Sequence, residues 1–467
     1  MEAILDLADR LHGFWQRFAA NFRTETRDGS QYAYHYLSGL LRMEKDRKFV
    51  NIGRQADVPG QNIQHFVSNS PWSAQAVIRQ VQEEIAAKPS LQKGGMLLLD
   101  ESADEKAGDN SAGAARQHNG RLGKVDMSQV GVFLAYANGS VWTWIDGELF
   151  IPQHWFEPQM SDKRKRVGIP AERQFDTKIQ LGWKMIQRAQ ASGFPFEAVG
   201  CDTLYGRSIW LRQQMDKTGI VYMADVPENT QVYLTRPTVG VPAQSRTKGR
   251  KPTRKRVLSS EPSIPVRGVG CREDTLWTRV VVRTTERGEL ADEFAVRLVW
   301  TLREGDPAEE WLVIRRAGDG ECSYTLSNAP RDTSVERLAW LRCQRYFVER
   351  ANQDAKSGLG WDELQAQKYR AWEHHLALTI MATWYIAETK LDWAQQHPRD
   401  PLLPGQFDTD VLPALSVANV RTLLRATMPL RQLTPEESVS LVIEHLVNRT
   451  RSRKSSLRSQ HKANSPP

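Results

Sequence analysis

Residues 94–100, GGMLLLD, form an apolar run that ends in an acid, and residues 196–202, FEAVGCD, repeat the pattern. Short apolar runs closed by a polar residue are typical of buried strands. Each run should place its last residue, Asp100 or Asp202, where a strand emerges from the sheet. An Asp at a strand end is more often a turn or cap former, so the pair needs support from the rest of the chain.

The segments around these runs predict a mixed sheet. Residues 129–137, QVGVFLAYA, and 140–152, SVWTWIDGELFIP, read as two strands joined by a tight hairpin at Asn138-Gly139. Two helices and a further strand are expected in residues 177–193, 207–219 and 220–227, in that order along the chain. The order β-β-β-α-β-α-β, counting the two runs above, predicts an α/β fold with helices packed on the sheet.

A third acid lies on a predicted helix at residues 345–356, RYFVERANQDAK. At 100° per residue, Arg345, Glu349 and Lys356 fall within about 40° of one another, so one face presents a carboxylate flanked by two cations. The purely structural interpretation is a set of helix-surface ion pairs that stabilise the helix by about 0.3–0.5 kcal/mol each. Gathered with Asp100 and Asp202, however, Glu349 would complete a cage of carboxylate oxygens, the ligands that Mg²⁺ prefers.

These motifs resemble those of DDE-type bacterial insertion-sequence transposases. In the insertion-sequence-four superfamily the third acid lies in Tyr-x2-Arg-x3-Glu-x6-Lys, and this chain matches at Arg345, Glu349 and Lys356 but has Arg342 at the Tyr position. The stretches LLLDESADEKAG, SAGAARQHNGRLGKVDMSQVGVFLAY and QHFVSNSPW are similar to the seven-oh-one group. The resemblance runs from about residue 50 to 390.

The resemblance implies a ribonuclease H-like catalytic core that cleaves transposon ends and transfers strands into target DNA. Asp100, Asp202 and Glu349 would be both the catalytic residues and the metal ligands. Two Mg²⁺ ions, for which Mn²⁺ can substitute, would activate the attacking hydroxyl and stabilise the leaving oxygen. Arg345, Lys356 and Arg342 would contact DNA. The partners implied are terminal inverted repeats and target DNA, with a homodimer in the DNA complex.

Other acids compete for the first metal position. Asp104, Glu105 and Asp109 follow Asp100 closely, but they are expected in a loop beyond the strand and would be held less rigidly. Asp100 is therefore preferred.

Positive charge is concentrated in two short segments. The net charge is +8, yet residues 246–256 carry seven cations and residues 449–462 carry six, with no acid in either, so the remainder carries −5. Both segments are expected to be loop or tail, either solvated or bound to a polyanion. In the first, Arg250, Lys251, Arg254 and Lys255 are candidate DNA contacts. A third basic segment, the predicted loop 113–124, adds three more candidates: Arg116, Arg121 and Lys124.

Five regions are expected along the chain. They are a helical N-terminal DNA-binding domain (1–92), the first part of the catalytic core (93–226), an inserted β domain (227–332), the last part of the core with the Glu349 helix (333–400), and a C-terminal helical segment with a basic tail (401–467). The N-terminal helices suit DNA docking and equally suit an ordinary helical bundle.

Composition predicts a cytosolic enzyme, and the resemblance implies that it is bacterial and nucleoid-associated. Four scattered cysteines lack metal-site spacing and are expected to be reduced, and neither a signal sequence nor a long apolar segment is recognised. Two alternatives stay open at this point. One is a catalytically silent DNA-binding or regulatory derivative, and the other is a ribonuclease H-like nuclease without strand transfer.

Overall fold

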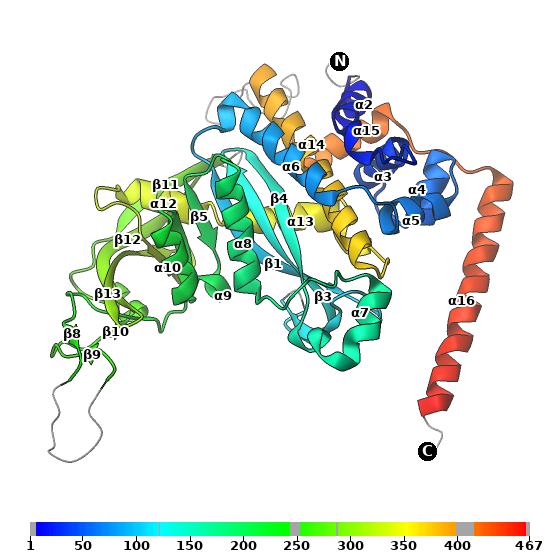
Figure 1. Cartoon of the computed structure of the whole chain (residues 1–467). Coiled ribbons are helices and arrows are strands. Elements are labelled where there is room, and N and C mark those ends of the chain that lie inside the picture. The colour runs from blue at the N-terminus through cyan, green and yellow to red at the C-terminus, as the bar shows by residue number, and fades with distance from the viewer. Residues whose placement is uncertain (1–5, 121, 243–252, 286–287, 398–414, 464–467) are drawn as a thin grey trace.

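The computed structural model describes residues 6–120, 122–242, 253–285, 288–397 and 415–463. Figure 1 shows a central sheet with a helical layer at the N-terminal side and strands β11–β13 at the opposite side. A long helix, α16, projects from the body.

The N-terminal helices pack around α14 (Tyr369–Gln396), a helix with mostly buried residues. These helices are α2 (Leu7–Phe18), α3 (Ser30–Arg42), α4 (Phe49–Ala56), α5 (Gly60–Ser68) and α6 (Ala74–Ala87), with short 3₁₀ turns at Ala19–Phe22 and Pro89–Leu91. Because α14 also packs on β4 of the sheet, it joins the helical layer to the core. The predicted helical character is thus observed for residues 6–92, while the DNA-binding role of this region stays a prediction.

Five strands form the centre of the sheet in the order β4-β3-β1-β5-β6. They are β1 (Met96–Glu105), β3 (Lys124–Asn138), β4 (Val141–Phe150), β5 (Ala198–Cys201) and β6 (Val221–Val226). Strand β3 is antiparallel to β1 and β4, whereas β5 and β6 run parallel to β1. This order, with a single reversed strand, confirms the predicted ribonuclease H-like fold. The predicted hairpin is also present, and Gly139 takes the positive φ of +59° that its turn requires.

Helices cover both faces of this sheet. Successive residues of a strand point to opposite faces, and Leu99 meets α8 (Lys178–Ala191) while Asp100 meets α13 (Tyr346–Gln353). A Cβ at Gly182 of α8 would come within 2.5 Å of the Leu99 side chain, so this glycine lets the helix approach closely. The other connecting helices are α7 (Ser161–Val167), α9 (Thr203–Gly206), α10 (Ile209–Lys217) and α12 (Val335–Cys343), with 3₁₀ turns at Gln153–Phe156, Pro158–Met160 and Trp361–Glu363.

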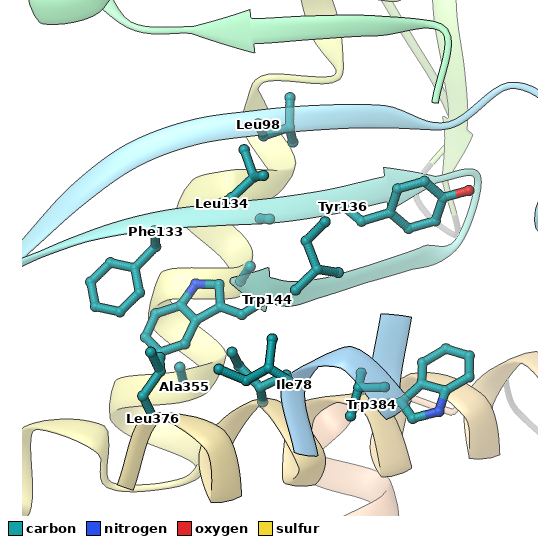
Figure 2. Packing of buried hydrophobic residues seen from close by; sticks show 14 of the residues in the cluster. Ile78, Leu98, Phe133, Leu134, Tyr136, Trp144, Ala355, Leu376 and Trp384 are labelled. Carbon is teal, nitrogen blue, oxygen red and sulfur yellow. The ribbon is translucent and has the colours of Figure 1, made fainter. Parts of the chain in front are cut away.

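The main core fills the space between the sheet and α14. Phe133 of β3 and Trp144 of β4 stack with their ring centroids 4.1 Å apart, and Leu376 of α14 lies beside them (Figure 2). Burying such large side chains contributes about 1.5–3 kcal/mol each. Packing of this kind makes the sheet and α14 one body around the strands that carry Asp100 and Asp202.

The region predicted as an inserted β domain extends the same sheet. Strand β14 (Cys322–Ser327) pairs with β6, and β13 (Asp306–Arg316), β12 (Gly288–Arg303) and β11 (Thr278–Thr285) follow outward. A second apolar cluster lies here, with Val299 and Leu312 at its centre. The small elements are β7 (Gln231–Val232), β8 (Val239–Gly240), β9 (Arg256–Val257), β10 (Ile264–Pro265) and α11 (Val266–Gly270). The boundaries at residues 227 and 332 stay predictions.

The C-terminal region departs from expectation. Two helices are described, α15 (Val417–Thr427) and α16 (Pro435–Ala463), so residues 449–462 continue a helix instead of forming an irregular tail. The reason is composition, since the segment contains neither Gly nor Pro and is rich in Arg and Lys, which favour helices. No helix in the described ranges has the length and apolar character needed to cross a membrane.

Candidate functional site

Asp100 and Asp202 lie side by side on neighbouring strands. Leu99 of β1 pairs in parallel with Cys201 of β5, so the next residue of each strand is the predicted acid. Strand β1 does not end at Asp100, as the sequence suggested, but runs to Glu105 because β3 continues to pair with it. Asp202 instead follows its strand directly and caps α9, where its Oδ1 accepts hydrogen bonds from the Leu204 and Tyr205 amides at 3.0 and 3.3 Å.

The surroundings of Asp100 favour the protonated form of its carboxyl group in the absence of a cation. Burial, together with the nearby charge of Asp202, raises the pKa of Asp100 to about 7. A hydrogen bond from the Glu101 amide to its Oδ1, at 2.8 Å, opposes this shift. Burial and the Glu101 carboxylate likewise raise the pKa of Asp202. A bound cation would reduce the repulsion between these two adjacent carboxylates and so favour their ionised forms.

Glu349 is ion-paired to Arg345, and the charge of Arg345 interacts with both aspartates. The Glu349 side chain is 57% exposed on α13, and its Oε1 lies 3.0 Å from Nη2 of Arg345. Nε of Arg345 lies 2.8 Å from Oδ2 of Asp225. Burial lowers the pKa of the Arg345 guanidinium, but four carboxylates outweigh it and raise that pKa: Asp225, Glu349, Asp100 and Asp202. Arg345 therefore occupies the electrostatic centre of the predicted acids.

Asp225 of β6 is an anchor that sequence reasoning missed. Its Oδ1 lies 3.2 Å from Nε of Arg342, accepts a hydrogen bond from the Thr325 hydroxyl at 2.6 Å, and its other oxygen binds Arg345. Arg342 is buried and also donates to the Ser323 hydroxyl at 3.0 Å. In this structure Arg342, a predicted DNA contact, thus holds α12 to the sheet. Asp225 follows an ordinary strand pattern, so only the fold reveals its two arginine partners.

Asn352 is a second residue that the sequence gave no reason to select. From α13 its Nδ2 donates to Oδ2 of Asp100 at 3.1 Å, and its Oδ1 accepts from the indole nitrogen of Trp144 at 2.9 Å. It lies one turn beyond Glu349 on the same helix, which is the only clue in the sequence. Asn352 fixes the orientation of Asp100 relative to the helix.

Lys356 lies beyond α13, in a π-helical turn at Asp354–Gly358, and contacts β1 further along the strand than Asp100. Nζ of Lys356 donates to the Ala103 carbonyl at 2.8 Å and lies 3.3 Å from Oδ1 of Asp104. Asp104, a competing metal candidate, is therefore buried against a lysine further along β1.

The remaining predicted DNA contacts have varied positions. Arg116 lies exposed in strand β2 (Ala115–Asn119) and Lys124 begins β3, so most of the predicted loop 113–124 is a β-hairpin, because its polar residues pair across the strands. Lys124 pairs with Asp126 at 2.9 Å, and Lys255 pairs with Asp306 at 2.5 Å. Arg254 is exposed near β9. Three candidates lie outside the described residues: Arg121, Arg250 and Lys251.

A hard divalent cation needs carboxylate oxygens, and Asp100 and Asp202 supply them. The raised pKa of both aspartates is what an unneutralised acidic pair produces. The nearby Glu101 is already ion-paired to Lys178 of α8 at 3.0 Å. Among the residues that the structure describes, no group of three or more His, Cys, Asp or Glu is arranged to hold an ion. The aspartate pair fits a cation, and Glu349 would join it only after release from Arg345.

A cavity of about 650 Å³ adjoins these residues. Arg345 and Glu349 line one part of it, and the rest of its wall combines cations with aromatic rings: Arg283, Arg315, Arg342, Trp142, Trp340, Tyr346 and Phe347. The space beside the predicted acids is therefore open, basic and large enough for an anionic group.

The chain is similar to known DDE endonucleases and transposases. A family model described as "DDE superfamily endonuclease" matches residues 17–289, more than half of the chain. A curated relative from Microchaete diplosiphon, described as "Probable transposase for insertion sequence element IS701", is 29% identical over 149 residues. That match covers 32% of this chain and 35% of the relative, about one third of either protein. The resemblance to insertion-sequence transposases inferred from the motifs is confirmed.

Among solved structures, the piggyBac transposase synaptic complex with hairpin DNA matches with a TM-score of 0.33 and 10% identity, covering 94% of this chain and 84% of that one. A score this low does not bear on the fold, which rests on the strand order described above.

Proposed function

Because the chain belongs to the DDE superfamily endonucleases, we propose that it is a DNA transposase that cleaves transposon ends and joins them to target DNA. The observation that carries the proposal is the adjacency of Asp100 and Asp202 at the end of the β1 and β5 pairing, with Glu349 on the neighbouring helix α13, where it is ion-paired to Arg345. The terminal inverted repeats and the target duplex would be its substrates, and two copies would hold the two ends.

Asp100, Asp202 and Glu349 would hold two Mg²⁺ ions, or Mn²⁺ in their place. Bound there, the ions supply Lewis acidity for in-line phosphoryl transfer. The aspartates must be ionised to serve as ligands, and Asn352 and the Glu101 amide orient the Asp100 carboxylate for that role. Glu349 is half exposed, so it can turn from Arg345 toward the aspartates.

The cations around the acids would position the DNA backbone. Arg345 is released from Glu349 when that residue turns inward, and its guanidinium then suits a bidentate contact with a phosphate beside the scissile bond. Asp225 keeps Arg345 at the site in both situations. Lys356 would reach a phosphate only by leaving Asp104. Arg116, Arg121, Lys124, Arg250, Lys251, Arg254 and Lys255 are proposed as further backbone contacts.

The test is a nicking assay on duplexes that carry the ends of the element. Asp100→Asn, Asp202→Asn and Glu349→Gln should each keep DNA binding in a gel shift and lose Mg²⁺-dependent nicking. Asp319→Asn is a matched control, because Asp319 lies in an exposed turn between β13 and β14. A triple variant that still nicks would refute the assignment.

Strand transfer needs its own measurement. A pre-nicked end with a free 3′ hydroxyl should join to a second duplex if the protein is a transposase. Nicking without joining would identify the nuclease alternative, and binding without nicking by the wild type would identify the silent derivative.

A further inference from the structure

Helix α7 carries four consecutive cations, from Lys163 to Arg166, that no predicted site uses. We call these four residues the α7 ridge. Lys165 and Arg166 are exposed, whereas Lys163 and Arg164 are partly buried. Among the described residues, neither Lys165 nor Arg166 makes an ion pair, and both present positive charge to solvent. The pKa of Asp109 is lowered mainly by Lys163 and also by Arg166, so the Arg166 charge is compensated in part.

The inner residues fix the ridge to the body of the protein. Nζ of Lys163 lies 2.6 Å from Oδ2 of Asp109 and 4.9 Å from the centre of the Trp155 ring. The Arg164 guanidinium lies 5.5 Å from the centre of the Phe156 ring. The outer cations are therefore presented by a short helix that is already held in place, which lowers the entropic cost of binding a ligand.

The ridge is connected to the proposed site through β1. Nη2 of Arg166 donates to Oδ1 of Asn110 at 3.2 Å, and Asn110 belongs to the loop that follows the strand carrying Asp100. Figure 1 shows α7 beside β3, on the side of the sheet opposite β12 and β13. Trp155, over whose ring Lys163 lies, donates from its indole nitrogen to the Ala114 carbonyl at 3.2 Å, so the ridge packs next to the segment that leads into β2.

We propose that the α7 ridge is a contact surface for the phosphate backbone of duplex DNA, and that Lys165 and Arg166 make the contacts. The inference rests on the proposed function and extends it by naming where the duplex leaves the site. Exposed cations on a helix that is held in place bind a phosphate backbone favourably, because each contact releases counterions condensed on the DNA. We expect these contacts to be independent of base sequence, because Lys and Arg side chains that bind phosphates carry no sequence information.

A purely structural role makes a different prediction. Three of the cations lie in the last turn of α7, where positive charge stabilises a helix end by about 0.3–1 kcal/mol. In that case removing the outer charges would lower the thermal midpoint slightly and leave DNA binding unchanged.

The experiment measures duplex binding by the full chain as a function of salt. The double variant Lys165→Gln/Arg166→Gln should reduce the slope of log K against log salt by about two, and weaken binding roughly 50-fold at 0.1 M salt if both residues contact phosphates. Lys184→Gln/Lys217→Gln removes the same charge from exposed positions on α8 and α10, and should leave the slope unchanged.

Two duplexes of equal length distinguish the source of the phosphates. One carries the terminal repeat and the other is unrelated. A reduced salt slope of the double variant on the first duplex would assign the ridge to the element end, and a reduced slope on the second would assign it to target DNA. An unchanged slope on both duplexes would overturn the inference. Nicking by the wild type is measured separately, so failure of the ridge and failure of the proposed function are distinguishable.

Discussion

Replacing Asp100 by Asn should stabilise the metal-free protein at alkaline pH even though it removes cleavage. Burial and the neighbouring Asp202 raise the pKa of Asp100 from 3.8 to about 7. A carboxyl group with a higher pKa in the folded state than in the unfolded chain destabilises the fold as the pH rises, because the unfolded chain loses its proton first. The penalty is absent below the ordinary pKa of 3.8 and fully developed above about pH 7.

The magnitude follows from the difference between the two pKa values, which corresponds to about 4 kcal/mol. About 2.5 kcal/mol of this develops between pH 5 and pH 8. Asn at position 100 never ionises, and it keeps an acceptor for the Glu101 amide. Its own amide group would face Nδ2 of Asn352, however, and such a donor pair costs about 1–3 kcal/mol. The expected net gain at pH 8 is therefore about 1–3 kcal/mol.

Urea-induced unfolding with EDTA at pH 5, 6.5 and 8 measures this effect. The free energy of unfolding of the Asp100→Asn variant should rise relative to the wild type as the pH increases, while Asp319→Asn should follow the wild type. If the wild type and the Asp100→Asn variant keep a constant difference across this range, then Asp100 is not held near neutrality by its surroundings. The reasoning about the site would then be refuted.

Three further substitutions test the surroundings of the site. Asp225→Asn should lower the free energy of unfolding by about 2 kcal/mol and also reduce nicking, because Arg345 loses its anchor. Asp146→Asn breaks the Asp146–Arg188 pair between β4 and α8 and should affect stability alone, as urea unfolding and a nicking assay together would reveal. Asn352→Ala should raise the pKa of the carboxyl it binds, and so shift the pH profile of nicking to higher pH; an unshifted profile would contradict its positioning role. Gly206→Ala should destabilise the protein by about 1–3 kcal/mol in the same unfolding assay, because a Cβ there would lie 2.0 Å from a backbone oxygen of β6. Retention of wild-type stability would show that β6 can shift.

The sequence predicted the central sheet well because its strands are buried on both faces. Runs such as GGMLLLD and QVGVFLAYA have few polar interruptions, so strand character is visible locally. Strands β2 and β14 were not predicted. ARQHN is polar and pairs at an edge, so its neighbouring strand supplies the pattern. CSYTLS does alternate, with Cys322, Tyr324 and Leu326 facing the second apolar cluster, so this short strand could have been recognised.

The candidate site was only partly accessible from sequence. Two aspartates at corresponding strand positions follow from the pattern, because parallel neighbours bring their ends together. The π-helical turn at Asp354–Gly358 and the contacts of Lys356 with β1 depend on packing, and no periodicity reveals them. Asp225 and Asn352 act through partners more than a hundred residues away along the chain, so only the folded arrangement identifies them.

The pairing of β6 with β14 has a consequence for biosynthesis. During translation the early strands emerge long before β14, so the outer edge of β6 has no neighbour and the Asp225 carboxylate has no guanidinium beside it. Only when the ribosome has passed α13 can that helix dock against β1, which places Arg345 beside Asp225 and Asn352 beside Asp100. A polypeptide that terminates before α13 would therefore leave Asp225 without the Arg345 guanidinium and Asp100 without the Asn352 amide.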